Sequence, residues 1–291
     1  MKIVNITGGL GNQMFQYAFA LALKERYPNE KILIDTTDYK RYIIHNGYEL
    51  EKLFDIQLKH ASIIEQLKVF YPFQSSLMQK LGRVFSSFPY KNVVSENEDM
   101  NFHPEIMERA ESTFYLGFWQ SEKYFKGIKD KIKDIYHFPK DENILNLRLK
   151  EEISNLNSTS LHVRHGDYLN FKNTYGICDL NYYQKAVSFI IERSHPECFV
   201  IFSDDLNWCR TFIAPMLGQY KLFFVDWNKR ETSFRDMELM SYCRNNIIAN
   251  STFSWWGAWL NEHSEKIVVA PSQWMRSGGW DDIIPEGWVR V

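Results

Sequence analysis

Short apolar segments alternate with segments of helical periodicity along most of this chain of 291 residues. Lys2–Ile6 is apolar, and Gln13–Glu25 places its apolar side chains at helical spacing. In the second half, the segments expected to form strands are Leu161–Arg164, Phe199–Phe202, Leu222–Val225, Ile247–Ala249 and Lys266–Ala270. The segments expected to form helices between them are Asn181–Arg193, Leu206–Leu217, Ser233–Arg244 and Thr252–Asn261. This alternation favours the α/β class with mostly parallel sheets.

A polar stretch between residues 140 and 158 separates two such series. We expect residues 1–150 to form an N-terminal Rossmann-like domain and residues 151–291 a C-terminal one. The C-terminal residues pack either on the second domain or back on the first. Ligands of such sheets bind outside the carboxyl ends of the strands, so we expect the two domains to face a cleft. Residues 40–140 are aromatic-rich and show few clear strands.

Charge and cysteine content exclude several classes of protein. The formal net charge of −2 gives no basic footprint for nucleic acid or for an anionic membrane surface. The four cysteines form no CxxC pair, so we expect free thiols in a reducing compartment. The start of the chain lacks a signal-peptide pattern, and no apolar run approaches the roughly 18 residues of a membrane span. We therefore expect a cytoplasmic protein.

The stretch Ser160–Tyr168, which reads SLHVRHGDY, places polar side chains at the end of an expected strand. His162 and Arg164 are separated by one residue and therefore lie on the same face of that strand. An arginine at the carboxyl end of a strand is well placed to hold a diphosphate with its planar guanidinium. It would stabilise the diphosphate as a leaving group. The alternative is an ion pair between Arg164 and Asp167 or another acid.

Two further motifs follow strands of the second half. Ser251 and Thr252 begin an expected helix, where hydroxyl and backbone N–H groups can cradle a phosphate or simply cap the helix. Asp205, next to Asp204, closes another strand. Its carboxylate could accept hydrogen bonds from N1–H and N2–H₂ of guanine, or it could cap the following helix. The two acids do not form a DxD motif, so we expect no essential metal.

The first strand is followed by the turn GGLGNQ, which opens a helix. Gly9 and Gly11 let the backbone approach a ligand closely, and a helix N-terminus favours an anion. Asn12 and Gln13 have amide groups that can bond sugar hydroxyls or phosphate. Because the turn matches neither GxGxxG nor a P-loop, a plain tight turn is the alternative.

Aromatic residues make up 16% of the chain. A bulky core explains them, and so does stacking of rings on the apolar faces of sugars. We expect Trp255, Trp256 and Trp259 to pack in the core.

Four motifs of this chain, in the same order, resemble those of the bacterial α-1,2-fucosyltransferases of glycosyltransferase family 11. They are GGLGNQMFQYAFA, LHVRHGDY, FSDD and NSTFSWWGAWL, and the resemblance runs from residue 5 to about residue 290. It implies the GT-B architecture of two Rossmann-like domains facing a cleft. It also implies an inverting, metal-independent transfer of L-fucose from GDP-fucose to the 2-hydroxyl of a terminal galactose, with no cofactor.

The resemblance implies roles for residues of the second half. Arg164 matches the arginine that contacts the diphosphate, and His162 matches the histidine beside the nucleoside. Asp205 matches an acid that reads guanine in related fucosyltransferases. Ser251 and Thr252 match the late hydroxyl motif near the phosphates.

The resemblance to this family also implies which residues lie near the reacting centre. Asn12, with Gln13, matches the early amide near that centre. Asp167 is the nearest candidate for a catalytic base by motif position, and an ion pair that orients Arg164 is the alternative role. His165 departs from the family, in which arginine is common at this position.

The partners implied are GDP-fucose and a galactose-terminated glycan, with no nucleic acid. Peripheral contact with a membrane that carries lipid-linked glycans is a further option. One alternative function is transfer of a different sugar from its nucleotide. Another is a carbohydrate-binding protein, which would leave Arg164 and the hydroxyl motif unexplained. We expect acceptor specificity to lie in residues 40–140.

Overall fold

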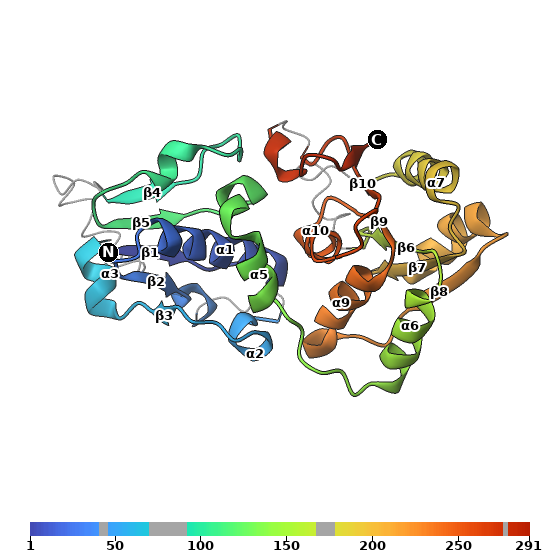
Figure 1. Ribbon diagram of the computed structural model, residues 1–291, viewed down its shortest axis with the longest axis horizontal. Helices are drawn as coiled ribbons and strands as arrows, with labels where there is room; N and C mark the ends of the chain where they lie inside the picture. Colours follow the sequence, from blue (N-terminus) through green and yellow to red (C-terminus); the bar gives the residue numbers. More distant parts are fainter. Residues whose placement is uncertain (41–45, 70–91, 167–177, 276–278) are drawn as a thin grey trace. The chain divides into compact units, whose positions relative to one another are not determined.

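The computed structural model describes residues 1–40, 46–69, 92–166, 178–275 and 279–291. The chain forms two compact units, Met1–His137 and Phe138–Val291 (Figure 1). Each unit is built on one parallel sheet, which confirms the expected α/β class with two Rossmann-like units. The division lies before helix α6 (Ile144–Ser154), whereas the sequence suggested a boundary near residue 150. Helix α6 belongs to the second unit because its Leu149 and Ile153 are buried in that unit's core.

The first unit contains a sheet of strand order β3-β2-β1-β5-β4, in which every pairing is parallel. Its strands are β1 (Lys2–Asn5), β2 (Ile32–Asp35), β3 (Lys59–His60), β4 (Val93–Ser95) and β5 (Thr113–Leu116). Its helices are α1 (Leu10–Arg26), α2 (Leu50–Leu53), α3 (Ile63–Val69) and α5 (Lys129–Ile135). Its 3₁₀ turns are Thr37–Lys40, Pro104–Met107, Glu122–Tyr124 and Lys126–Ile128.

Helix α1 is the central helix of this unit. Its residues from Leu10 to Leu23 are buried except for Asn12, so the helix has almost no solvent face before its last turn. One face of the sheet packs against Val69 of α3. On α1, Phe19 meets the ring of Tyr115 in β5 at 5.3 Å. Apolar burial of this extent makes α1 a rigid support for the turn that precedes it.

The second unit contains a sheet of strand order β11-β10-β9-β6-β7-β8, also entirely parallel. Its strands are β6 (Ser158–Val163), β7 (Cys198–Ser203), β8 (Lys221–Val225), β9 (Asn245–Ile247), β10 (Val268–Ala270) and β11 (Val289–Arg290). Its longer helices are α6, α7 (Leu180–Ser194), α9 (Phe234–Tyr242) and α10 (Thr252–Trp259). In chain order the strands run 3-2-1-4-5-6, the arrangement of a dinucleotide-binding fold.

Helices cover both faces of this second sheet. Leu161, Val163 and Ile201 pack on one face with Tyr183 of α7. On the other face, β7 and β8 pack against α6 and α9. The last residues belong to this sheet, since β11 pairs with β10 and the Val291 N–H donates to the Ala270 carbonyl at 3.1 Å.

The expected helix over Leu206–Leu217 is divided into three helical pieces. They are α8 (Leu206–Trp208), a π turn (Cys209–Ile213) and a 3₁₀ turn (Ala214–Leu217). Further 3₁₀ turns are Arg230–Thr232 and Asp281–Ile283. The division is consistent with Pro215, whose missing N–H and ring oppose a continuous α-helix.

The expectations for the cysteines and the tryptophans are confirmed. All four cysteines are buried free thiols. Trp255, Trp256 and Trp259 are buried, and Trp256 meets Trp259 at 5.2 Å, so these rings pack in the core. Among the described residues, the structure contains no helix long and apolar enough to cross a bilayer.

Candidate functional site

The predicted motifs of the second unit lie around the point where its strand order reverses. Strands β6 and β9 are neighbours in the sheet, and Leu161 is in register with Ile247. The chain leaves β6 toward α7 and the β7 side, and it leaves β9 toward α10 and the β10 side. Parallel strands that lead away in opposite directions create a crevice at their carboxyl ends, where ligands of such sheets bind. Residues 162–166 and 250–253 therefore meet at this edge.

His162 has a buried ring nitrogen at this edge. The residue is 5% exposed, and its Nδ1 has no hydrogen-bond partner among the residues that the structure describes. Its ring lies 6.1 Å from that of Phe253 in α10. Burial, together with the nearby charge of Arg164, lowers the pKa of His162 to about 3, so the imidazole is neutral. A buried polar atom without a protein partner is a candidate ligand contact.

Arg164 is held by Asp204, which follows β7. The Nε of Arg164 lies 3.5 Å from Oδ2 of Asp204, and both side chains are partly exposed. The other oxygen of Asp204 accepts from the backbone N–H of His165 at 3.0 Å and of Gly166 at 3.1 Å. One carboxylate thus fixes the turn after β6 and orients the guanidinium through its inner nitrogen. The ion pair foreseen as an alternative for Arg164 therefore exists, and its acid is Asp204.

Asp205 caps helix α8. Its Oδ1 accepts from the Trp208 N–H at 3.0 Å, and its Oδ2 lies 3.0 Å from His165 Nδ1. The Trp208 N–H and then His165 lower the pKa of Asp205. The His165 ring stacks on the Trp208 indole at 4.6 Å. The structure realises the capping alternative, and the expected contact with guanine stays a prediction that competes with these two bonds.

The hydroxyl motif follows β9. Ser251 is the N-cap residue of α10 and is 9% exposed, yet its side chain makes no capping hydrogen bond. Buried Asn250 holds the turn by donating from Nδ2 to the Trp274 carbonyl at 3.0 Å. Thr252 is the first residue of the helix. The first N–H groups of a helix have no partner within it, so this end of α10 suits an anion.

The glycine turn of the first unit connects β1 to α1. Gly8 has φ of +81°, a backbone conformation that strains any residue with a side chain, and a Cβ there would also press on Nδ2 of Asn12 at 2.7 Å. Gly9 is the N-cap residue of α1, and Gly11 is buried in its first turn. Asn12 is partly exposed, and its Oδ1 accepts from Gln120 Nε2 at 2.8 Å.

Gln13 occupies a structural position. It is fully buried, and its Nε2 donates to the carbonyls of Gly8 at 3.0 Å and Gly47 at 2.8 Å. Its Oε1 accepts from the Glu49 N–H at 2.9 Å. These bonds use the carboxamide to hold the turn in place, so Gln13 lacks the exposure that its expected ligand contact needs.

Sequence reasoning missed three polar residues behind this turn. Gln16 accepts from the Thr7 N–H at 2.9 Å and donates to the Gly117 carbonyl at 2.9 Å. Gln120 reaches Asn12, and Glu96 accepts from backbone N–H groups of the loop after β5. A polar side chain at an apolar position of a helix was the available signal for Gln16. Nothing in the sequence distinguishes Glu96 from its acidic neighbours.

The expected catalytic base, Asp167, lies outside the described residues, so its role stays a prediction. The described residues contain no group of three or more His, Cys, Asp or Glu side chains that could hold a metal ion. The expected independence from metal likewise stays a prediction.

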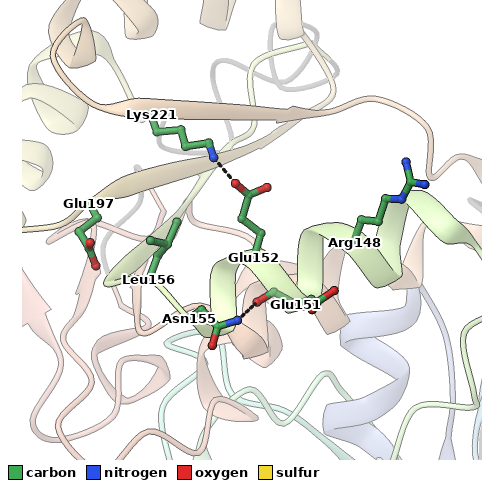
Figure 2. Close-up of a pocket in the computed structure, with 7 residues that line it drawn as sticks. All are labelled: Arg148, Glu151, Glu152, Asn155, Leu156, Glu197 and Lys221. Carbon is green, nitrogen blue, oxygen red and sulfur yellow. Dashed lines mark hydrogen bonds and ion pairs between the residues drawn. The ribbon is translucent and has the colours of Figure 1, made fainter.

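A groove of about 640 Å³ lies at the opposite edge of the second sheet, where the strands begin (Figure 2). It is lined by Arg148, Glu151, Glu152, Asn155, Leu156, Glu197 and Lys221. Lys221 pairs with Glu152, and the remaining charges are of both signs. This mixture gives no concentrated positive charge for a diphosphate, so the groove is not the candidate site.

The two Rossmann-like units, each built on its own parallel sheet, define a GT-B-like fold. The chain is similar in fold to the NodZ α-1,6-fucosyltransferase, whose structure was determined after soaking with GDP-fucose. The TM-score is 0.53 at 16% identity, with 89% of this chain and 91% of the other covered.

The family follows from the sequence match. A model described as "Glycosyl transferase family 11" matches residues 1–291, and the chain belongs to this family of glycosyltransferases. It is similar to an α-1,2-colitosyltransferase of Escherichia coli, with 34% identity over 99% of this chain and 98% of the relative. It is also similar to the galactoside 2-α-L-fucosyltransferase SEC1 of Bos taurus, with 33% identity over 34% of this chain and 27% of the relative.

Proposed function

We propose that this protein transfers L-fucose from GDP-fucose to the 2-hydroxyl of a terminal galactose, with inversion and without a metal or other cofactor. The proposal is supported mainly by one observation. Arg164, His162 and the start of α10 lie together at the edge of the second sheet where the strand order reverses. Membership of glycosyltransferase family 11 supports the reaction class.

The donor would lie on the second unit. Arg164 would hold the β-phosphate of GDP, and Ser251 and Thr252 with the first N–H groups of α10 would hold the phosphate oxygens. Because burial keeps His162 neutral, it would offer a hydrogen bond to the nucleoside and no charge. The positive charge at this edge would then come from Arg164 and the α10 dipole.

The chemistry would be one in-line displacement at the anomeric carbon. The galactose hydroxyl forms the new glycosidic bond, the bond to the β-phosphate oxygen breaks, and GDP takes the electron pair. Arg164 would stabilise the charge that develops on that oxygen. Because bond breaking runs ahead of attack, the hydroxyl proton needs only a weak base, for which Asp167 is the candidate. Asn12 would lie near the reacting centre.

A second candidate donor is GDP-colitose, favoured by the full-length similarity to a colitosyltransferase. Colitose is L-fucose without its 3-hydroxyl. Acceptance of one sugar over the other would depend on a hydrogen-bonding group at that hydroxyl, and such a group discriminates strongly when it is left unpaired.

The test is a transfer assay of the full chain with GDP-fucose, GDP-colitose, GDP-mannose and UDP-galactose on a β-galactoside acceptor, with linkage analysis by NMR. We expect the highest kcat/KM with GDP-fucose, an α-1,2 product, and unchanged activity in EDTA. A higher kcat/KM with GDP-colitose would replace the first candidate by the second. GDP binding without transfer, or glycan binding without GDP binding, would refute the proposal.

Arg164→Ala should lower kcat at saturating GDP-fucose on the order of 10²–10³-fold, because the leaving group loses its cation. Arg148→Ala, in the groove at the other edge, is the matched control and should keep full activity. Equal kcat for the two variants would remove the leaving-group role from Arg164.

A further inference from the structure

Glu96 lies directly after β4 and faces the loop that follows β5. Its Oε2 accepts from the Phe118 N–H at 2.6 Å, and its Oε1 accepts from the Trp119 N–H at 2.8 Å. Its own backbone N–H donates to the Leu116 carbonyl at 2.8 Å. Burial raises the pKa of Glu96 to about 7, although these backbone N–H groups act in the opposite direction. Glu96 therefore connects the ends of two neighbouring strands.

The loop that Glu96 holds has a strained residue. Trp119 has φ of +55°, a left-handed conformation that is rare for a bulky side chain. Its indole is fully buried and stacks on Phe19 of α1 at 4.5 Å. The Trp119 Nε1 has no hydrogen-bond partner among the described residues. Such a conformation persists only where the surroundings enforce it, and the contacts that hold it here include Glu96, the Phe19 stack and the ring of Tyr124.

The strained residue is followed by Gln120, which reaches the first turn of α1. Gln120 is buried, and its Nε2 donates to Asn12 Oδ1 at 2.8 Å. This bond turns the oxygen of the Asn12 carboxamide toward Gln120 and leaves its Nδ2 on the side of Gly8. The orientation of a partly exposed amide thus depends on a buried one, which depends on the loop and on Glu96.

The geometry points to Glu96 as a positioning residue that fixes the orientation of the Asn12 carboxamide through the loop after β5 and Gln120. Every link lies among the described residues of the first unit. The inference rests on the proposed function only in placing Asn12 near the reacting centre.

The test begins with Glu96→Gln, which keeps the size of the side chain and turns an NH₂ group toward a backbone N–H. We expect kcat at saturating donor and acceptor to fall about 10–100-fold, since a small misplacement at a reacting centre has this effect. The Kd for GDP, measured by calorimetry, should stay within about twofold, because Arg164, Ser251 and Thr252 belong to the other unit. The matched control is Glu98→Gln, an exposed glutamate two positions along, which should change neither quantity.

A second readout does not need activity. In protein with ¹⁵N-labelled Asn and Gln, the side-chain NH₂ signals of Asn12 and Gln120 should shift in Glu96→Gln and stay in place in Glu98→Gln. Gln120→Glu reverses the hydrogen bond between residues 120 and 12, because a carboxylate can only accept where the amide donated. The Asn12 carboxamide should then rotate to present its NH₂ group. We expect a lower kcat and an unchanged affinity for GDP. If Glu96→Gln does not fold, Gln120→Glu decides the last step of the path from Glu96 to Asn12, and an unmoved Asn12 carboxamide or an unchanged kcat in this variant would overturn the inference.

Unmoved Asn12 signals in Glu96→Gln, or a kcat equal to that of Glu98→Gln, would overturn the inference. If the wild-type protein neither binds GDP nor transfers fucose, the proposed function fails by itself. The NMR comparison then still decides whether Glu96 orients Asn12.

Discussion

At the residue scale, His162 shows how burial decides the chemistry of a side chain. Its Nδ1 is enclosed without a partner among the described residues, and Arg164 follows two residues later, directly after the end of β6. Both circumstances disfavour a second proton on the ring. A neutral imidazole can hydrogen-bond a ligand without adding to the charge of the site.

This neutrality predicts a specific dependence of stability on pH. The pKa of His162 in the folded protein, about 3, lies below its ordinary value of 6.5. The stability gained from burying the neutral ring is therefore complete above about pH 6.5 and is lost as the pH falls toward 3. Between pH 7.5 and pH 4.5, the wild-type free energy of unfolding should fall on the order of 2 kcal/mol further than that of His162→Asn.

Urea unfolding of both proteins at the two pH values provides the measurement. His195→Asn is the control, because His195 is exposed and has φ of 50°, a conformation that Asn tolerates. Parallel pH curves for the wild type and His162→Asn would mean that His162 takes up its proton normally.

Adjacent acids illustrate what the sequence could not resolve. The pattern predicted two acids at the end of β7, but it could not assign their partners. In the structure Asp204 holds Arg164 and the turn after β6, while Asp205 caps α8. Side chains of consecutive residues leave a strand in opposite directions, so the following turn decides which acid meets the neighbouring strand.

At the element scale, α9 and α10 pack closely at one glycine. A Cβ added to Gly257 would lie 2.8 Å from Met240 Cβ and 3.4 Å from the Met237 carbonyl oxygen. The residue at this position therefore sets how closely the two helices approach. The start of α10 belongs to the candidate site, so this packing also positions Ser251 and Thr252.

Gly257→Ala should destabilise the protein by about 1–3 kcal/mol, because the extra methyl group overpacks the contact between the helices. Urea unfolding measures the change. Gly127→Ala is the matched control, since a Cβ at Gly127 meets nothing within 4 Å, and it should alter stability by less than about 0.5 kcal/mol. An unchanged free energy of unfolding in Gly257→Ala would show that α9 and α10 can move apart to admit the methyl group.

The sequence predicted helices and strands correctly where strand and helix segments alternate regularly, and it missed strands that are short. The βα series of the second unit is reproduced with small shifts at the ends of elements, as in β6 and α7. Strand β5 was missed although it lies next to β1, because four residues among aromatic neighbours carry no measurable periodicity. Its position follows from pairing with a strand far away in the sequence.

At the scale of the whole molecule, the two edges of the second sheet differ in chemistry. The carboxyl edge gathers Arg164, the neutral His162 and the start of α10. The opposite edge carries the groove of mixed charge around Glu152 and Lys221. A diphosphate should therefore distinguish between the two edges.

Hydrogen exchange of the full chain with and without saturating GDP tests this expectation. Amides of residues 253 and 254 should exchange about tenfold or more slowly with GDP, because a diphosphate bound at the start of α10 would cover this turn of the helix. Amides of residues 148–156, beside the groove, should not change. Protection of the groove segment in place of the α10 segment would move the nucleotide to the other edge.

The pairing of β1 has a consequence for the order in which the first unit can assemble during synthesis. Lys2 is in register with Ile32 on one side and with Thr113 on the other. Until the ribosome has released the segment around Thr113, one side of β1 exposes unpaired backbone groups and apolar side chains. Such an edge invites pairing with other chains. We therefore expect truncations that end before residue 113 to aggregate.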